Sequence, residues 1–516
     1  MKKVLLGNEA IARGAFEAGC TVVASYPGTP STEITESVAR DFPDIKSQWS
    51  PNEKVAFEVA AGASVAGARS MTCMKHVGLN VAADPLFTFS YTGVNGGLVI
   101  INADDPGAWS SQNEQDNRHY ARAAKVPMLE PSDPQEAKDF TRAAFELSEK
   151  YDRPVIVRTT TRISHSQGIV ELADPEQYQI KPFVRNPKKF VMIPAHARPR
   201  HIVIEELMLK LRDASATLPF NRIEWGSTKR GIITAGASYN YVKETCPDDS
   251  ILKIGLMWPL PDELIRQFAQ KVEELIIVEE LDPFIEKYVR MMGIKCKGKE
   301  LIPLCGELTP DIVDAALNGN AHENRIPPYA GKIPARPPAL CKGCPHIAVF
   351  SVLKKLDLNV NGDIGCYTLG VLPPYSAMHS QGCMGASIGM HLGFEKANPA
   401  LARNSVAVIG DSTFIHSGIT PLIDLVYNKG TGTVLILDNR ITAMTGHQEN
   451  PSTGVTLRGE PTYELNLEAL CRACGVDRVT VIDPNNIEEF EKVVKEEVAA
   501  EAPSVIIARR KCILKK

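Results

Sequence analysis

The predicted fold rests on one stretch of the sequence, residues 410–448, which reads GDSTFIHSGITPLIDLVYNKGTGTVLILDNRITAMTGHQ. An apolar run at 406–409 comes before it and predicts a buried strand that ends close to Asp411. A helical pattern follows, and a second apolar run at 434–437 predicts another buried strand that ends close to Asn439. Open parallel sheets bind ligands beyond the carboxyl ends of their strands, so we expect both side chains to face one crevice. Carboxylate and amide oxygens are ligands that suit Mg²⁺.

The order strand, Gly-Asp-Ser, helix, strand and Asn resembles the signature of thiamine diphosphate enzymes. This resemblance implies that Asp411, the Asn439 side chain and the Ile441 carbonyl hold Mg²⁺, and that the metal holds the diphosphate of the cofactor. Gly410 would let the backbone come close to that diphosphate, with Ser412 beside it. The alternative from the residues alone is an ordinary βαβ unit in which Asp and Asn only form turns.

Length and composition are those of an ordinary globular protein. The chain has 516 residues, 23% charged and 44% hydrophobic, which indicates two to four domains. The net charge of -4 gives no sign of a nucleic-acid or membrane partner. We find no run of about 18 apolar residues and therefore expect a cytoplasmic protein. In a reducing compartment the 12 cysteines are not expected to form disulfides.

Short apolar runs alternate with helical patterns along most of the chain, which predicts parallel α/β sheets. We predict two thiamine-diphosphate-binding parallel-sheet domains with an α/β domain between them that resembles the carboxyl-terminal domain of transketolase. The expected segments are a pyrimidine-binding domain at 1–170, a linker at 171–229, the transketolase-like domain at 230–320, a linker at 321–339 and a diphosphate-binding domain at 340–516.

Thiamine enzymes also need a carboxylate beside the aminopyrimidine ring of the cofactor, because a proton shared between the two activates the ring. A helical pattern begins at Asn52-Glu53 and carries Gly62 and Gly67. It resembles the pyrimidine-domain helix of pyruvate:ferredoxin oxidoreductases, which implies that Glu53 is the catalytic carboxylate. Glu58 is the alternative, and either residue could instead be an ordinary solvated or salt-bridged helix residue.

Two more segments of the first domain match that family. YPGTP at 26–30 resembles its YPxTP loop, which implies a catalytic role for Thr29 on the substrate side and places Gly28 at the cofactor. The alternative is a plain turn before a helix cap. KHVG at 75–78 falls where the family has a loop near the cofactor, so His76 is a candidate catalytic contact to diphosphate or substrate.

The third domain carries further cofactor-binding segments. GCMG at 382–385 resembles the Gly-x-Met-Gly segment that thiamine enzymes place at the pyrimidine, although a close helix–strand turn is the alternative. TGHQ at 445–448 resembles the TGGQ segment of 2-oxoacid:ferredoxin oxidoreductases, with His447 in place of the second Gly. From these matches we expect the following residues at the cofactor: Gly365, Cys366, Tyr367, Gly382, Met384, Met444 and Thr445.

Cys341-Lys-Gly-Cys344 opens the diphosphate-binding domain at a spacing that suits zinc or an iron–sulfur cluster. In pyruvate:ferredoxin oxidoreductases a similar pair and two later cysteines hold a [4Fe–4S] cluster, which implies Cys366 and Cys512 as the other two ligands here. A structural zinc on Cys341, Cys344 and His346, or free buried thiols, remain alternatives. A second pair, Cys471 and Cys474, lies in a helical pattern that indicates core residues.

Seven segments together closely resemble the α subunits of indolepyruvate:ferredoxin oxidoreductases: SYPGTPSTE, SPNEKVAFEVAAGASVAGAR, MKHVGLNVAADP, CKGCPH, GDIGCYTLGVLPP, GDSTFIHSGI and DNRITAMTGHQ. The resemblance implies oxidative decarboxylation of an arylpyruvate with coenzyme A, transfer of electrons to ferredoxin, a β subunit, and a dimer of αβ pairs. That family usually ends in a two-cluster ferredoxin domain. This chain ends soon after Cys512 without the corresponding cysteine run, so either the sequence is truncated or it is a natural short form.

Two other classes of function remain open at the level of sequence. A non-oxidative thiamine decarboxylase would share Glu53, Asp411 and Asn439 but would need neither the cluster cysteines nor coenzyme A. A non-catalytic scaffold subunit would keep the fold alone, and the presence of those three residues argues against it.

Overall fold

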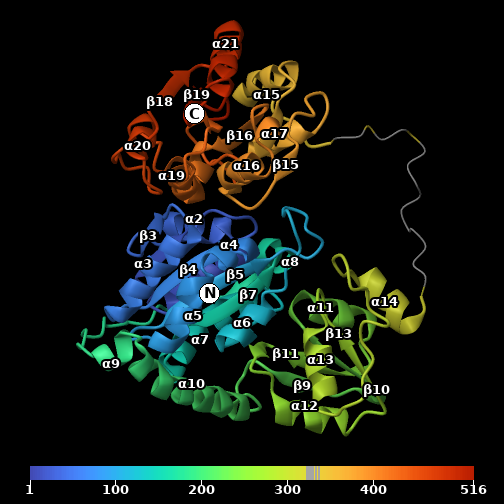
Figure 1. The fold of residues 1–516 in the computed structure, drawn as a ribbon. Coiled ribbons are helices and arrows are strands. Elements are labelled where there is room, and N and C mark those ends of the chain that lie inside the picture. Colours follow the sequence, from blue (N-terminus) through green and yellow to red (C-terminus); the bar gives the residue numbers. More distant parts are fainter. Residues whose placement is uncertain (321–330, 332–333, 335–336, 516) are drawn as a thin grey trace. The chain divides into compact units, whose positions relative to one another are not determined.

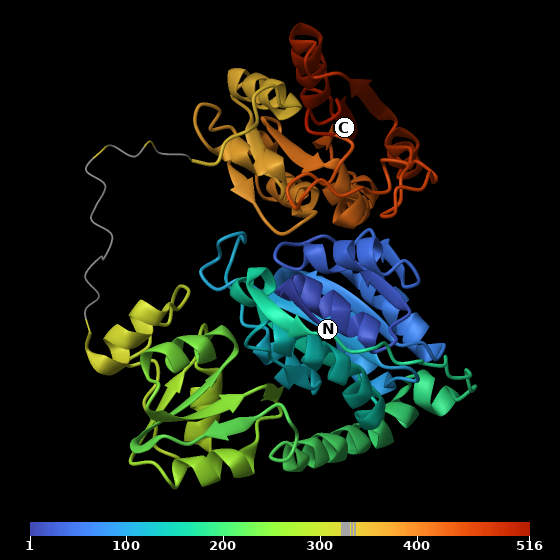
Figure 2. The same ribbon diagram turned by 180° about the vertical axis from the view of Figure 1, so that it is seen from behind.

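The short apolar runs of the sequence form strands in which nearly every side chain is buried, as expected for sheets covered on both faces. In the computed structural model, β16 (Ser405–Gly410) and β17 (Thr433–Asp438) are buried along their whole length. The structure describes residues 1–320, 331, 334 and 337–515, and Figures 1 and 2 show their ribbon from opposite sides. The chain divides into two compact units, Met1–Pro328 and Tyr329–Lys516. The predicted linker at 321–339 lies largely outside the described residues.

A seven-stranded sheet forms the centre of the first unit. Its strands, in spatial order, are β12 (Leu256–Trp258), β6 (Met128–Leu129), β7 (Val155–Thr160), β5 (Leu98–Asp104), β4 (Ser70–Lys75), β2 (Val22–Ser25) and β3 (Lys46–Trp49). All neighbouring strands are parallel except β12, which pairs antiparallel with β6 and comes from the middle domain. A separate ribbon joins β1 (Lys2–Leu6) to β8 (Gln167–Glu171).

Helices cover both faces of this sheet. They are α1 (Gly7–Glu17), α2 (Thr32–Asp41), α3 (Glu53–Val65), α4 (His76–Val81), α5 (Ala83–Thr92), α6 (Arg118–Ala124), α7 (Pro134–Tyr151), α8 (Thr161–His165), α9 (Pro187–Phe190) and α10 (Pro194–Ala214). Helices α1 and α7 pack against each other over one face of the sheet, and α3 and α5 pack together over the other face. The long helix α10 runs along the edge of the unit, between α5 and the middle domain (Figure 1).

The middle domain has a four-stranded sheet, in the order β13 (Glu274–Val278), β10 (Ser227–Ala235), β11 (Asp249–Ile254) and β9 (Arg222–Glu224). Its helices are α11 (Gly236–Thr245), α12 (Asp262–Ala269), α13 (Phe284–Met291) and α14 (Pro310–Asn318). Ile233 and Ile277 of this sheet lie in the same buried apolar cluster as Phe57 and Ile156 of the first domain. The first and middle domains therefore share one core.

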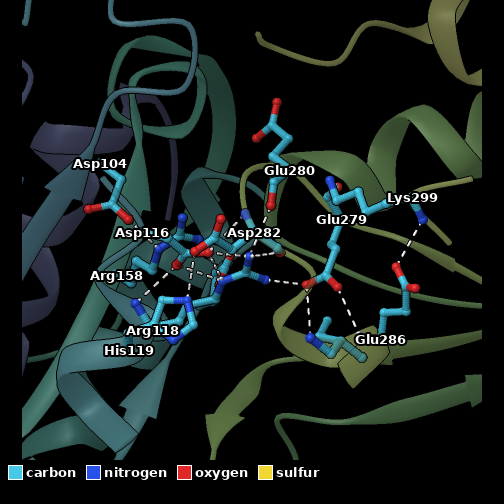
Figure 3. A network of polar contacts seen from close by, with 12 residues as sticks. Asp104, Asp116, Arg118, His119, Arg158, Glu279, Glu280, Asp282, Glu286 and Lys299 are labelled. Atoms are coloured by element: carbon cyan, nitrogen blue, oxygen red, sulfur yellow. Dashed lines mark hydrogen bonds and ion pairs between the residues drawn. The ribbon is translucent and has the colours of Figure 1, made fainter. Parts of the chain in front are cut away.

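A buried ion pair between Arg118 and Glu279 crosses the boundary between these two domains (Figure 3). Arg118 is buried and forms ion pairs with Asp116 at 2.6 Å and with Glu279 at 2.5 Å. Its guanidinium also donates to the Glu280 carbonyl at 2.9 Å. A buried charge that loses its partner is costly, so the network favours one arrangement of the two domains.

The carboxyl group of Glu280 leads to a prediction of how the stability of the protein depends on pH. Burial raises its pKa to about 7, with smaller contributions from Glu307 and Glu130, although the Leu308 N–H and Arg158 oppose the shift. The folded protein therefore favours the neutral carboxyl, and ionisation reduces stability as pH rises from about 4.5 to 7. We expect Glu280→Gln to be more stable than the wild type at pH 8 by about 2 kcal/mol and equal to it near pH 4.5. Thermal unfolding at both pH values measures this, with the exposed Glu273→Gln as control. A lower stability of Glu280→Gln at pH 8 would contradict it.

The second unit contains a six-stranded parallel sheet, in the order β15 (Ser380–Gln381), β14 (Asn359–Gly362), β16, β17, β19 (Ser504–Arg509) and β18 (Arg478–Ile482). Its helices are α15 (Pro345–Lys355), the 3-10 helix η1 (Cys366–Val371), α16 (Ala386–Ala397), α17 (Pro399–Ala402), α18 (Asp411–Thr413), the π-helix η2 (Phe414–Gly418), α19 (Ile419–Tyr427), α20 (Leu467–Ala473) and α21 (Ile487–Val498). The direction of chain progression across the sheet reverses between β14 and β16, which is where open α/β sheets bind ligands.

The α/β architecture and its parallel sheets confirm the predicted fold class. Cys471 is fully buried, and Cys474 packs against the same core, as expected for core residues. Helical structure begins earlier than the sequence pattern indicates, because α18 and η2 fill the stretch between β16 and α19. Of the helices in the described part of the chain, none combines the length and apolar character needed to cross a lipid bilayer.

Candidate active site of the thiamine type

Asp411 and Asn439 lie at the carboxyl ends of two adjacent strands. Gly410 of β16 pairs with Leu437 of β17, so the two side chains begin at the same edge of the sheet. Asp411 is 2% exposed and Asn439 is 9% exposed. Ile441, whose carbonyl is the third expected Mg²⁺ ligand, is buried as well. The sequence-predicted metal ligands therefore lie together in a shielded place.

The electrostatics of Asp411 suit a cation. Burial, with a smaller contribution from the neighbouring Asp438, raises the pKa of this carboxyl to about 7. Two neutral groups donate to its Oδ2: the Ser452 hydroxyl at 3.0 Å and the Asn450 amide at 3.4 Å. A divalent ion would supply the positive charge that these neutral donors do not. The oxygen donor set of Asp411, Asn439 and Ile441 therefore fits Mg²⁺.

The loop after Asn439 folds back on itself. The Thr442 N–H donates to the Gln448 carbonyl at 2.9 Å, and the Gln448 N–H donates to the Thr442 carbonyl at 3.1 Å. Met444 and Thr445 lie between these bonds, and Met444 is half exposed. His447 has φ of 69°, a left-handed conformation that glycine adopts most easily, which explains why the related pattern has Gly there.

Tyr367 lies over the start of the turn that carries Asp411. A Cβ atom at Gly410 would come within 2.8 Å of the Tyr367 ring, so the side chain of Tyr367 already requires a glycine at this position. Asp363 connects the same region to the GCMG segment, because its carboxylate accepts from the N–H groups of Gly385 at 2.9 Å and Ser387 at 3.0 Å. The loops that carry Cys366 and Met384 are thus joined through one buried carboxylate.

The four cysteines of the predicted cluster share one neighbourhood. Burial raises the pKa of the Cys344 thiol to about 11, together with smaller contributions from Cys512, Cys341 and Cys366. Among the described residues, no three cysteines bring their Sγ atoms within 4.8 Å of one another, and Cys341, Cys344 and His346 form no such close group either. Tetrahedral zinc with Zn–S bonds of about 2.3 Å needs ligand atoms that are closer together. The geometry therefore does not support zinc on Cys341, Cys344 and His346.

In the first unit, Glu53 is the buried member of the two candidate carboxylates. It begins α3, and Asn52 caps this helix by accepting from the Val55 N–H at 2.9 Å. Glu53 is 5% exposed, and a Cβ atom at Gly78 would lie 2.7 Å from its carboxylate oxygen. Glu58 is exposed and forms a salt bridge with Lys54. The burial therefore favours Glu53 for the pyrimidine-side role.

The loops bearing Thr29 and His76 lie beside each other at the ends of β2 and β4. A Cβ atom at Gly28 would lie 3.0 Å from the Cβ of Lys75. The His76 side chain is completely buried, and burial lowers its pKa to about 4. Its Nε2 lies 3.0 Å from the Ser111 hydroxyl, which donates to Asp105 at 2.6 Å.

No sequence pattern indicated several of these partners. Asp105, Ser111, Asp363, Asp438, Asn450 and Ser452 are close in space to the candidate residues. What these residues share in the sequence is that each is polar and lies at or just beyond the end of a strand or motif. Ser110, whose carbonyl accepts from Lys75, belongs to the same set.

Two family models match the chain. Residues 13–209 match the thiamine diphosphate-binding domain of pyruvate flavodoxin/ferredoxin oxidoreductase, and residues 363–508 match the C-terminal TPP-binding domain of thiamine pyrophosphate enzymes. A solved 2-oxoglutarate:ferredoxin oxidoreductase from Magnetococcus marinus has the same fold, with a TM-score of 0.53 and 19% identity over 62% of this chain and 65% of that one. The fold and the matched domains define a thiamine diphosphate-binding protein of the 2-oxoacid oxidoreductase class.

Curated relatives narrow the class further. The indolepyruvate oxidoreductase subunit IorA of Archaeoglobus fulgidus is 43% identical over 99% of this chain and 87% of its own length. The IorA subunit of Pyrococcus horikoshii is also 43% identical, over 99% of this chain and 86% of its own length. The chain belongs to the family of indolepyruvate oxidoreductase IorA subunits.

The contact between Gly78 and Glu53 can be tested by one added methyl group. Gly78→Ala would push the Glu53 carboxylate out of its place, because the new Cβ would lie within 3.0 Å of three of its atoms. We expect catalytic turnover to fall by about 100-fold. The matched control is Gly62→Ala, since a Cβ there meets nothing within 4 Å. Steady-state assays with the thermal unfolding of both variants measure this; equal activity would contradict it.

Proposed function

We propose that this chain is the catalytic α subunit of an indolepyruvate:ferredoxin oxidoreductase. In this proposal an arylpyruvate and coenzyme A yield arylacetyl-CoA and carbon dioxide, and the electrons pass to ferredoxin. One structural observation supports the oxidative reaction most directly. The main-chain N–H of Cys512 donates to the Asn439 carbonyl at 3.0 Å, which brings the candidate cluster next to the candidate metal ligand. Electrons released at the cofactor would then have an acceptor close by.

In this proposal different residues would bind the metal and cofactor, hold a proton, face the substrate and hold the cluster. Asp411, Asn439 and Ile441 would hold Mg²⁺ and, through it, the diphosphate of thiamine diphosphate. The bound cofactor supplies the electron sink for decarboxylation. The buried Glu53 would hold the proton that it shares with the aminopyrimidine ring, and its shielding from water strengthens that interaction. Thr29 would face the substrate, while Cys341, Cys344, Cys366 and Cys512 would hold a [4Fe–4S] cluster.

The sequence indicates that His76 contacts diphosphate or substrate, whereas in this proposal it has a structural role. Its buried ring contacts Ser111, so it would hold the loop that follows β5 rather than touch the diphosphate. The other expected residues, Gly28 in the first unit and those in the second unit, would contact the cofactor as well. A β subunit, ferredoxin, coenzyme A, an assembly of two αβ pairs and a cytoplasmic location complete the proposal. The word subunit in the names of the relatives supports the β subunit, and the name of the solved structure includes ferredoxin and coenzyme A.

A non-oxidative thiamine decarboxylase is the second candidate function. It would use the same Glu53, Asp411 and Asn439 and release carbon dioxide without an electron acceptor. The shared neighbourhood of four cysteines beside Asn439 favours the oxidative reaction, because a decarboxylase has no need of them.

Replacement of Glu53 tests the pyrimidine-side assignment. Glu53→Gln keeps the size of the side chain but removes the exchangeable carboxyl proton, so we expect turnover to fall by about 1,000-fold while thiamine diphosphate still binds. Carbon dioxide release from indolepyruvate and cofactor binding by circular dichroism measure the two effects. Glu58→Gln is the control, since that carboxylate is exposed. Normal turnover of Glu53→Gln would refute the assignment.

An anaerobic visible spectrum tests the redox assignment. With the β subunit, thiamine diphosphate and Mg²⁺ present, we expect an iron–sulfur absorption band that bleaches when indolepyruvate is added. Cys366→Ala should lose that band, whereas Cys305→Ala, an exposed cysteine in the other unit, should keep it. Carbon dioxide release without iron would instead support the non-oxidative decarboxylase.

A further inference from the structure

His346 occupies a position between the two candidate centres of the second unit. It lies in the first turn of α15, two residues after Cys344, and is 3% exposed. Its Nε2 lies 3.5 Å from the Asn439 side-chain nitrogen. Its ring meets that of Tyr367 edge to face with centroids 6.0 Å apart. One buried imidazole thus contacts a metal ligand and the residue that follows Cys366.

In the contact between His346 and Asn439 the donor and the acceptor can be assigned. The amide nitrogen can only donate, so the imidazole Nε2 must accept. Nε2 accepts only when it carries no proton, which is the case for one nitrogen of the neutral ring. The Asn439 Oδ1 faces the other way and accepts from the Ile441 N–H at 3.2 Å, with a second lone pair left over. This orientation gives the metal an oxygen rather than an NH₂ group.

The main chain of Asn439 is held from the cysteine side as well. Its carbonyl accepts from the Cys512 N–H at 3.0 Å. Asn439 therefore receives hydrogen bonds or contacts from both ends of the candidate cluster: from His346 next to Cys344, and from Cys512 itself. A partner of this kind, outside the metal ligands, commonly changes metal affinity by about 10- to 100-fold.

We propose that His346 is a positioning residue that orients the Asn439 amide toward the metal and links the Cys341–Cys344 segment to the Mg²⁺–diphosphate site. This inference rests on the proposed function, since it takes Asn439 as a metal ligand. It adds a residue to the site that contacts neither the metal nor the substrate. The His346 side chain would also connect the candidate cluster to the Mg²⁺–diphosphate site.

Mn²⁺ in place of Mg²⁺ gives a direct readout that does not depend on turnover. The test uses the full-length chain with its β subunit, thiamine diphosphate and Mn²⁺, and measures free Mn²⁺ by electron paramagnetic resonance. We expect His346→Leu to weaken Mn²⁺ binding by about 10- to 100-fold. His346→Gln, whose amide oxygen can accept the same hydrogen bond, should recover most of the affinity. Iron content and the thermal unfolding midpoint are measured on the same samples.

His391→Leu is the matched control. His391 is also buried in this unit, but it packs against Gly432 at the opposite end of β17. We expect its Mn²⁺ affinity to equal that of the wild type. Equal weakening in His391→Leu and His346→Leu, or no recovery in His346→Gln, would show that His346 only fills space and would overturn the inference.

The remaining outcomes separate this inference from the proposed function. Wild-type affinity for Mn²⁺ in His346→Leu would overturn the positioning role alone. A wild-type protein that lacks iron but loses Mn²⁺ on the His346→Leu change would remove the cluster from the proposed function and support the positioning role. A wild-type protein that binds no Mn²⁺ with thiamine diphosphate would overturn both.

Discussion

Two buried carboxylates at the ends of adjacent parallel strands are the main electrostatic constraint on the candidate site of the second unit. Parallel pairing brings Asp411 and Asp438 to the same edge, and burial makes their charges costly. Arg509 balances Asp438 at 2.7 Å, whereas Ser452 and Asn450 donate hydroxyl and amide hydrogen bonds to Asp411. The loop that follows β17 therefore folds back onto the Asp411 carboxylate.

The first unit holds the single carboxylate of Glu53 away from water. The helix that begins at Glu53 depends on a sheet whose one edge is completed by the middle domain. The shared apolar core and the ion pair between Arg118 and Glu279 hold the two domains together. The middle domain therefore supports the sheet on which the helix of Glu53 packs.

Local pattern was enough to predict the strands near 406–409 and 434–437 and the class of fold, because buried parallel strands are short, apolar and bounded by polar residues. It could not separate Glu53 from Glu58 by periodicity, since both lie in one helix and only burial tells them apart. Contacts such as Asp105 with Ser111 and His76, or Ser452 with Asp411, join residues whose separation in sequence is set by loops. No periodic signal encodes such contacts.

The pairing of β12 with β6 has a consequence for where this chain can be divided. The family model for the first domain ends at residue 209, yet the strand that closes that domain's sheet lies at Leu256–Trp258. A fragment cut at the end of the sequence match would leave β6 as an open edge with unpaired main-chain groups, the kind of surface on which sheets join one another. The segment that matches the family model is thus shorter than the segment that completes the two sheets, whose last strand, β13, ends at Val278.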